Sequence, residues 1–379
     1  MLIVRSPVRI SFGGGGTDLP AYYEKFGGAV LSASINKYFY TILQKRRDGK
    51  IQIISSDLRV VENWRDISRM DVKRSALEIP LAVIKELGCD FSVDLFLASE
   101  IIAGSGLGSS ASVCVGVLKT LANYLDLSLS KYELAERSFH IARNILGKPV
   151  GKQDEYAAAF GGLNFITFRP DGSTDVEPVL LRADHLREFE SNLMLFFTGA
   201  AHNSWELLQQ QEQSTKSGVR STVDSLREIR ELADHLRGAL LKGDLPTFGA
   251  LLHEGWEAKK KISSHISNPL IDQAYALARQ NGALGGKITG AGGGGFLLLF
   301  SEERHQEKVR DAMAQLGLRE VAFGLDFQGA HVVANDPFID RDEKCGMRWT
   351  FVPVLRHEPP PNFLLADCPI FMSNTKSVV

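Results

Sequence analysis

A glycine- and serine-rich stretch has the composition of a loop that binds phosphate. It covers residues 103–117 and reads AGSGLGSSASVCVGV. Glycines let backbone N–H groups converge on an anion, and a helix N-terminus adds unpaired donors and the positive end of a dipole. A serine-capped turn uses the same residue types, but this stretch holds more glycine than a cap needs. It lacks the lysine of a Walker A loop and a clearly placed acidic residue of a dinucleotide fingerprint, so we expect another kind of site for a phosphate chain.

Two further glycine clusters lie far from the first stretch. Gly13–Gly16 are consecutive and lead into Thr17 and Asp18, whose side chains can hydrogen-bond hydroxyl groups. Residues 285–295 (GGKITGAGGGG) run into an apolar segment. Successive glycines allow a close approach of the backbone to a ligand, whereas a flexible hairpin turn is the alternative for the first cluster. Arg9 precedes that cluster by four residues, so it is either a solvated edge charge or part of a site.

An acidic residue and several lysines are the remaining candidates for chemistry. Asp154 lies in the segment GKQDEYAAAFGG, residues 151–162. It can cap the short helix expected there, which is the more common role of aspartate at such a position, but the small residues after it favour close packing and a buried site. Lys152, Lys287 and the run Lys259–Lys261 can contact a phosphate; a solvated surface is the alternative for the run.

Hydrophobic periodicity predicts the elements that position these residues. Residues 91–102 alternate as a strand before the first glycine stretch, and apolar residues at helical spacing follow that stretch up to residue 125. Strands are also expected at residues 2–12, 29–45, 50–55, 163–168, 193–198 and, with a turn, 320–333; helices are expected at 75–87, 131–146, 204–241 (one or two), about 248–256, 269–282 and 302–316. Residues 169–190 are polar and are interpreted as a connection between domains.

The composition is that of a globular protein without a strong electrostatic bias. The chain has 379 residues, of which 44% are hydrophobic and 23% charged, and its net charge is −2. The length allows two domains, and the charge favours neither nucleic acid nor a membrane as partner. The apolar runs are too short to cross a bilayer, and residues 1–12 lack the pattern of a signal peptide. The 4 cysteines are scattered without metal-ligand spacing, so we expect a cytoplasmic protein with reduced thiols.

Along the chain, the glycine motifs at residues 13–16, 103–117 and 285–295, with Asp154 between the last two, resemble those of the GHMP small-molecule kinases. The resemblance covers residues 2–333. The segments SPVRISFGGGGTDLP, GKQDEYAAAFGG and GGKITGAGGGGF are most similar to the D-glycero-D-manno-heptose 7-phosphate kinases, which phosphorylate the anomeric (C1) oxygen of a sugar phosphate. This resemblance implies a two-domain α+β fold. A mixed α/β N-terminal domain with a left-handed βαβ unit (1–187) is followed by a ferredoxin-like C-terminal domain (188–333) and an irregular extension (334–379).

The resemblance also implies an ATP-dependent sugar kinase that uses Mg²⁺, with roles assigned residue by residue. Asp154 matches the catalytic base, and Arg9 matches the basic residue that faces it. Asp18 matches the aspartate that binds sugar hydroxyls, and Ser110 the serine that contacts Mg²⁺. The implied ATP-binding residues are Gly104, Ser105, Gly106, Leu107, Gly108, Ser109 and Ser110. The implied substrate-binding residues are Gly14, Gly15, Gly16, Thr17, Asp18, Lys152, Gly292 and Gly293.

Two positions depart from the family pattern. Ala142 stands where many members carry a glutamate that contacts Mg²⁺, so the ion is expected to be held by ATP oxygens, Ser110 and water. His202 stands where the heptose kinase pattern leads us to expect an arginine. Kinases for an octose phosphate, fucose or another hexose therefore stay open, as does a catalytically weak nucleotide- or sugar-binding regulator on the same fold. The anomer and the oligomeric state stay open as well.

Overall fold

The two longest strands form an antiparallel pair that carries the first glycine cluster. In the computed structural model, which describes residues 1–66, 71–88, 92–102, 104–199 and 204–336, β1 (Leu2–Gly13) pairs with β2 (Gly28–Lys45) along nearly its whole length. The valine, isoleucine and phenylalanine side chains of β1 are mostly buried, as suits β-branched and aromatic residues on a pleated surface. Because β1 ends at Gly13, the strand holds Arg9 and the start of the glycine cluster in a fixed relation.

A mixed sheet is built around this pair. Within the described residues its strand order is β12-β1-β2-β5-β3-β4, with β6 paired to β2 and β7 paired to β6. β3 and β5 run parallel, and α2 lies between them in the chain, which gives a βαβ unit. The remaining strands are β3 (Ile51–Ser55), β4 (Val60–Trp64), β5 (Val93–Ser99), β6 (Leu163–Phe168), β7 (Thr174–Pro178) and β12 (His331–Asn335).

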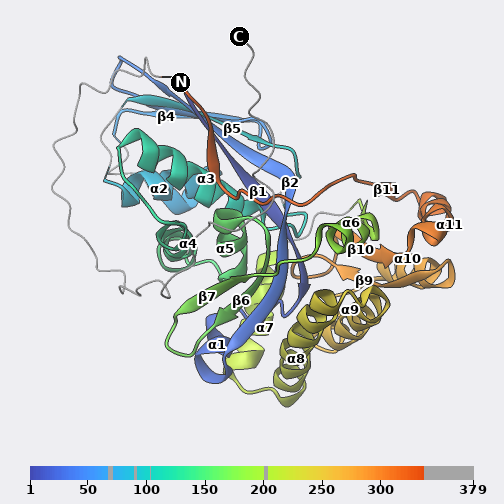
Figure 1. The fold of residues 1–379 in the computed structure, drawn as a ribbon. Helices are drawn as coiled ribbons and strands as arrows, with labels where there is room; N and C mark the ends of the chain where they lie inside the picture. The colour runs from blue at the N-terminus through green and yellow to red at the C-terminus, as the bar shows by residue number, and fades with distance from the viewer. Residues whose placement is uncertain (67–70, 89–91, 103, 200–203, 337–379) are drawn as a thin grey trace, which may run out of the picture. The chain divides into compact units, whose positions relative to one another are not determined.

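Helix α3 (Ser109–Tyr124) starts within the glycine- and serine-rich stretch 103–117 and packs against β1 and β2 (Figure 1). Its apolar residues recur at helical spacing, and Cys114, Leu118 and Leu121 are buried. α4 continues into a π-helical turn, Ile141–Ile145, so the helix predicted at 131–146 changes its geometry in the last turn. The other N-terminal helices are α1 (Pro20–Phe26), a 3₁₀ turn (Val72–Arg74), α2 (Glu78–Glu86), α4 (Lys131–His140) and α5 (Gln153–Phe160).

The second sheet is ferredoxin-like. Its order is β11-β8-β10-β9, and all of its pairs are antiparallel. In chain order the elements are strand, helices, strand, strand, helix and strand, as in a ferredoxin-like unit. The strands are β8 (Leu193–Phe197), β9 (Ala283–Ile288), β10 (Phe296–Ser301) and β11 (Arg319–Glu320). The helices are α7 (Ser204–Lys216), α8 (Arg220–Lys242), α9 (Leu245–Lys260), α10 (Pro269–Gln280) and α11 (Glu303–Gln315).

One hydrophobic cluster connects the two sheets. The ring of Phe12 on β1 meets those of Phe189 and Phe248, with centroid distances of 5.4 and 5.7 Å. The same cluster includes Leu31 of β2 and Phe300 of β10. This packing fixes β1, and with it Arg9, against the C-terminal elements. Among the helices that the structure describes, none is both long and apolar enough to cross a membrane.

Two parts of the chain differ from the predicted elements, and a third decides between two predicted alternatives. The polar segment 169–190 contains β7 and most of α6 (Ala183–Ser191), a helix in which only Phe189 is buried. The stretch 204–241, predicted as one long helix or two, consists of two helices, α7 and α8. β12 crosses the predicted boundary at residue 333 and pairs with β1; most of the predicted extension, from residue 337 on, lies outside the described residues.

Candidate active site

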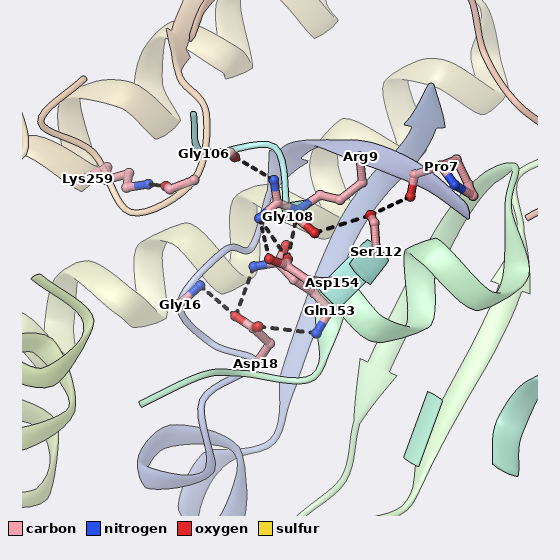
Figure 2. A network of polar contacts seen from close by, with 11 residues as sticks. Pro7, Arg9, Gly16, Asp18, Gly106, Gly108, Ser112, Gln153, Asp154 and Lys259 are labelled. Atoms are coloured by element: carbon pink, nitrogen blue, oxygen red, sulfur yellow. Dashed lines mark hydrogen bonds and ion pairs between the residues drawn. The ribbon is translucent and has the colours of Figure 1, made fainter. Parts of the chain in front are cut away.

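The Asp154 carboxylate is held by two hydrogen bonds from Arg9 (Figure 2). Nε of Arg9 donates to Oδ1 at 2.8 Å, and Nη2 donates to Oδ2 at 2.9 Å. Nη1 of Arg9 donates to the Gly106 carbonyl at 2.7 Å. The Arg9 side chain is 5% exposed and the Asp154 side chain 28%, so the arginine is enclosed while the carboxylate reaches the cavity. A bidentate arginine fixes the plane of a carboxylate.

The glycine stretches pack closely against each other and against Asp154. A Cβ atom on Gly106, whose φ is +81°, would lie 2.5 Å from the Thr289 carbonyl oxygen. A Cβ atom on Gly108, whose φ is +77°, would lie 3.1 Å from Oδ2 of Asp154. Gly108 is the N-cap of α3. The free N–H groups of this helix therefore open beside the Asp154 carboxylate, where a phosphate group can bind.

Asp18 is a second carboxylate in the same cavity. It accepts hydrogen bonds from the Gly16 N–H at 2.8 Å and from Nε2 of Gln153 at 3.2 Å (Figure 2). Burial, followed by the charge of Asp154, raises the pKa of Asp18. Gly151 leaves room for it, since a Cβ atom there would lie 2.0 Å from Oδ2 of Asp18. An acceptor held in this way is suited to binding hydroxyl groups.

One cavity brings together many of the residues that the sequence singles out. The predicted site residues that line it are Arg9, Gly15, Gly16, Asp18, Gly104, Gly106, Gly108, Ser109, Ser110 and Asp154. Ser105 and Leu107, which belong to the same loop as Gly104–Ser110, are instead fully buried. Gly14 and Thr17 support the first glycine cluster, because Oγ1 of Thr17 donates to the Gly14 carbonyl at 2.8 Å. Ala103 and His202 lie outside the described residues.

The last glycine stretch faces the cavity with residues other than Gly292 and Gly293, the two predicted to bind the substrate. Gly290 and Ala291 line the cavity. Gly293 instead donates its N–H to the Ile266 carbonyl at 2.8 Å, and a Cβ atom on Gly292 would lie 3.0 Å from the Ile266 backbone. Gly292 and Gly293 therefore support the loop through their contacts with Ile266 and do not line the cavity.

The structure corrects the prediction that Lys152 contacts the substrate. Lys152 is 4% exposed and is not one of the residues that line the cavity. Its Nζ donates to Oε1 of Glu136 and to the Gly172 carbonyl, both at 2.7 Å, and it lies over the rings of Tyr23 and Phe139. The ammonium group is thus compensated inside the protein.

The residues at the start of α3 fit a Mg²⁺ ion bound mainly through a nucleotide. Ser110 lines the cavity and offers a hard oxygen ligand. Ala142, in the π-helical turn, also lines the cavity and offers only a methyl group. No group of three or more His, Cys, Asp or Glu side chains suited to a metal occurs in the described part of the chain. Mg²⁺ commonly keeps several waters and needs only one or two protein ligands besides substrate phosphates.

Several cavity residues were not found from the sequence. Ser11, Gln153 and Glu155 line the cavity, and Trp205 and Gln211 reach it from α7. No pattern around Trp205 or Gln211 pointed to the site, since their contacts arise from the packing of a distant helix. Glu155 and Gln153 flank Asp154 in the sequence, so their place next to the site could have been inferred.

The sequence matches two family profiles. These are GHMP kinases N terminal domain, over residues 72–162, and GHMP kinases C terminal, over residues 236–317. A D-glycero-alpha-D-manno-heptose 7-phosphate kinase from Campylobacter jejuni is 34% identical over 301 residues, which cover 78% of this chain and 88% of that protein. The chain belongs to the GHMP kinase family.

Two other proteins similar to this GHMP kinase are named as a heptose phosphate kinase and a fucokinase. The crystal structure of a D-glycero-D-manno-heptose 1-phosphate kinase from Bacteroides thetaiotaomicron superposes with a TM-score of 0.73 at 29% identity, covering 89% of this chain and 100% of that one. An L-fucokinase/L-fucose-1-P guanylyltransferase from Bacteroides fragilis is 26% identical over 79% of this chain, which spans only 34% of that longer protein. The two-domain GHMP kinase fold expected from the glycine motifs is confirmed.

Proposed function

We propose that this GHMP kinase transfers the γ-phosphoryl group of ATP to the anomeric (C1) hydroxyl of a sugar phosphate, D-glycero-D-manno-heptose 7-phosphate. The observation that carries the proposal is the Arg9–Asp154 pair beside Gly108 at the start of α3. It puts one oriented carboxylate next to a phosphate-binding helix N-terminus. The 34% identity to a heptose 7-phosphate kinase supports the choice of sugar.

The chain's own side chains would position the reactants. The Asp154 carboxylate accepts a hydrogen bond from the attacking hydroxyl, and Arg9 holds that carboxylate in one plane. As the new O–P bond forms and the bond to ADP breaks, the hydroxyl proton passes toward Asp154. Ser110 and the N–H groups of α3 face the phosphates. When bound, Mg²⁺ would offset negative charge on the phosphate oxygens.

A coupled assay for ADP release with a panel of sugars tests the proposal. Heptose 7-phosphate, an octose phosphate, L-fucose, galactose and unphosphorylated heptose are each mixed with ATP and Mg²⁺. We expect heptose 7-phosphate to give the highest kcat/KM. Faster turnover of L-fucose would instead favour the fucokinase-like activity that the Bacteroides fragilis relative suggests.

A second candidate is a regulator that binds nucleotide and sugar with little turnover. Ala142 favours it, since the cavity wall has a methyl group where many family members supply a carboxylate. The same panel separates the two candidates. Tight sugar and nucleotide binding by calorimetry, without ADP release for any sugar, would support the regulator.

A further inference from the structure

Two lysines from the C-terminal half are buried in the wall of the cavity. Lys259 lies near the end of α9 and Lys287 lies on β9. Each is 7% exposed, and both line the cavity that contains Asp154. Removing an ammonium group from water is strongly unfavourable unless another group compensates the charge. An anion bound next to both lysines would therefore stabilise their ammonium groups.

The protein compensates these charges only in part. Nζ of Lys259 donates to the Gly290 carbonyl (Figure 2), and within the described residues neither ammonium group forms an ion pair. Arg9 is a third cation that acts on both, and its own charge is matched by Asp154. Burial, followed by Arg9, lowers the pKa of Lys259 to about 8. Burial, followed by Lys259 and Arg9, lowers the pKa of Lys287. The residues that the structure describes therefore leave the charged forms of both lysines only partly compensated.

We propose that Lys259 and Lys287 together bind a phosphate monoester that the sugar carries away from the hydroxyl that is phosphorylated. A phosphate dianion matches two ammonium charges and gives each a charge-assisted hydrogen bond. This inference rests on the proposed function. It deepens that function by naming the two residues that bind the phosphate group of the proposed sugar phosphate.

The donors already present for the nucleotide phosphates favour the sugar's phosphate as the ligand of the two lysines. The nucleotide phosphates have other donors, in loop 104–110 and at the N-terminus of α3. The acidic group that acts on Lys259 is Asp18, which belongs to the first glycine cluster. Lys259, Lys287 and Asp18 all line the same cavity.

The two lysines that follow Lys259 in the sequence have partners and provide a control. Lys260 pairs with Glu257 at 2.8 Å, and Lys261 pairs with Glu228 at 3.2 Å. These contacts are the ordinary ion pairs of a helix surface. Lys260 is thus a matched control, since it has the same charge and is the next residue of the same helix.

The test compares sugars that differ only in the phosphate. Binding of D-glycero-D-manno-heptose 7-phosphate and of the free heptose is measured by calorimetry without nucleotide, and binding of ATP and ADP is measured separately. We expect Lys259→Met and Lys287→Met each to weaken binding of the phosphorylated sugar at least tenfold. Binding of the free heptose and the ratio of ATP to ADP affinity should stay unchanged, and Lys260→Met should change nothing. Melting temperatures no lower than that of the wild type would exclude unfolding as the cause.

Other outcomes overturn the assignment. The lysine variants could weaken binding of the two sugars equally, or the wild type could bind both sugars equally well. Either result would show that the sugar's phosphate does not bind at this site. Weaker binding of ATP but not of ADP would put the lysines at the γ-phosphate instead. The proposed function is tested separately: lysine-dependent binding of the sugar phosphate without ADP release keeps this site and rejects the kinase. ADP release that does not depend on the lysines would keep the kinase and reject this site.

Discussion

At the scale of single residues, Asp18 and Asp154 are two carboxylates of one cavity with different partners. Asp154 is paired with Arg9, whereas Asp18 accepts hydrogen bonds from backbone and amide N–H groups. A carboxylate fixed by arginine keeps one orientation, which suits contact with the reacting hydroxyl. One surrounded by neutral donors is better suited to binding hydroxyls that do not react.

Replacing Asp18 should separate sugar binding from nucleotide binding. Asp18→Asn keeps the shape of the side chain but replaces one acceptor oxygen with a donor. Since hydrogen bonds to charged groups contribute about 1.5–3 kcal/mol, we expect the KM for the sugar to rise roughly tenfold to a hundredfold. The KM for ATP should change less than about twofold by the same scale of argument. Steady-state kinetics with each substrate varied in turn checks this, and equal increases in both KM values would argue against a sugar contact.

Glu155 should make the protein less stable as the pH rises. It is 2% exposed, and in the described part of the chain its Oε2 has no hydrogen-bond partner. Burial, followed by the charge of Asp154, raises the pKa of Glu155 well above its usual value. The folded state therefore binds this proton more tightly than the unfolded chain does, and stability falls as the pH rises above the ordinary glutamate pKa.

Glu155→Gln removes the ionisable group and keeps the shape. At pH 8 we expect the free energy of unfolding to rise by about 1–3 kcal/mol, the cost of an uncompensated buried group. The gain should be smaller at pH 5. Denaturant unfolding at the two pH values measures it, with Glu307→Gln on the exposed side of α11 as the control. A variant that is less stable than the wild type at pH 8 would show that the charged carboxylate is stabilised by a partner.

Several site residues could be predicted because their chemistry is local. Glycines at close approaches, and an aspartate flanked by small residues, leave a pattern in the sequence. The role of Lys152 could not be predicted, because its ammonium group is compensated by Glu136 and by the Gly172 carbonyl, and neither contact follows from a spacing. Lys259 and Lys287 are 28 residues apart in the sequence, and only the fold brings both into one wall.

At the scale of elements, the glycine stretch 103–117 depends on contact with the stretch 285–295. Gly106→Ala would put a Cβ atom 2.5 Å from the Thr289 carbonyl oxygen at a φ of +81°. We expect a loss of about 1–3 kcal/mol in the free energy of unfolding, together with weaker ATP binding because the loop must move. The control is Gly238→Ala in α8, where nothing lies within 4 Å, and there alanine should stabilise the helix by about 0.5–1 kcal/mol. Unchanged stability and ATP binding in Gly106→Ala would contradict this account of the loop.

Most strands and long helices could be predicted from periodicity, since β1, β2, α3 and α10 have clear apolar patterns. α6 could not, because it buries only Phe189. The π-helical turn Ile141–Ile145 could not either, since it differs from an α-helix in backbone geometry rather than in its apolar pattern. Such turns occur often at functional sites, and this one contributes Ala142 to the cavity.

At the scale of the whole molecule, an ion pair connects α7 to the π-helical turn. Arg143 donates from Nη1 to Oε2 of Glu212 at 2.8 Å, although the two residues are 69 positions apart in the chain. The pairing with Arg143 lowers the pKa of Glu212 to about 2. α7 also brings Trp205 and Gln211 to the cavity. Contacts of this kind depend on tertiary packing, so no local pattern could predict them.

Breaking this ion pair should destabilise the protein in a pH-dependent way. Because the folded-state pKa of Glu212 is depressed, its stabilising contribution is complete above the ordinary glutamate pKa and is lost as the pH falls toward about 2. We expect Glu212→Gln to lower the free energy of unfolding by about 1–3 kcal/mol at pH 7, with a smaller difference from the wild type as the pH falls from about 4.5. Lys216→Met removes the exposed partner of Glu212 and should have little effect. A difference that does not vary with pH would contradict the ion-pair explanation.

The most direct test of the central claim is a ³¹P NMR spectrum of the reaction of heptose 7-phosphate with ATP and Mg²⁺. For the wild type we expect a new resonance that couples to the anomeric proton and grows in step with the ADP signals. For Asp154→Asn, which keeps the size of the side chain, the resonance should form at least about a hundredfold more slowly, while ATP binding by calorimetry is unchanged. Phosphate transfer to another sugar oxygen, or an Asp154→Asn variant as fast as the wild type, would contradict the assignment of Asp154 and Arg9 to transfer at the anomeric hydroxyl.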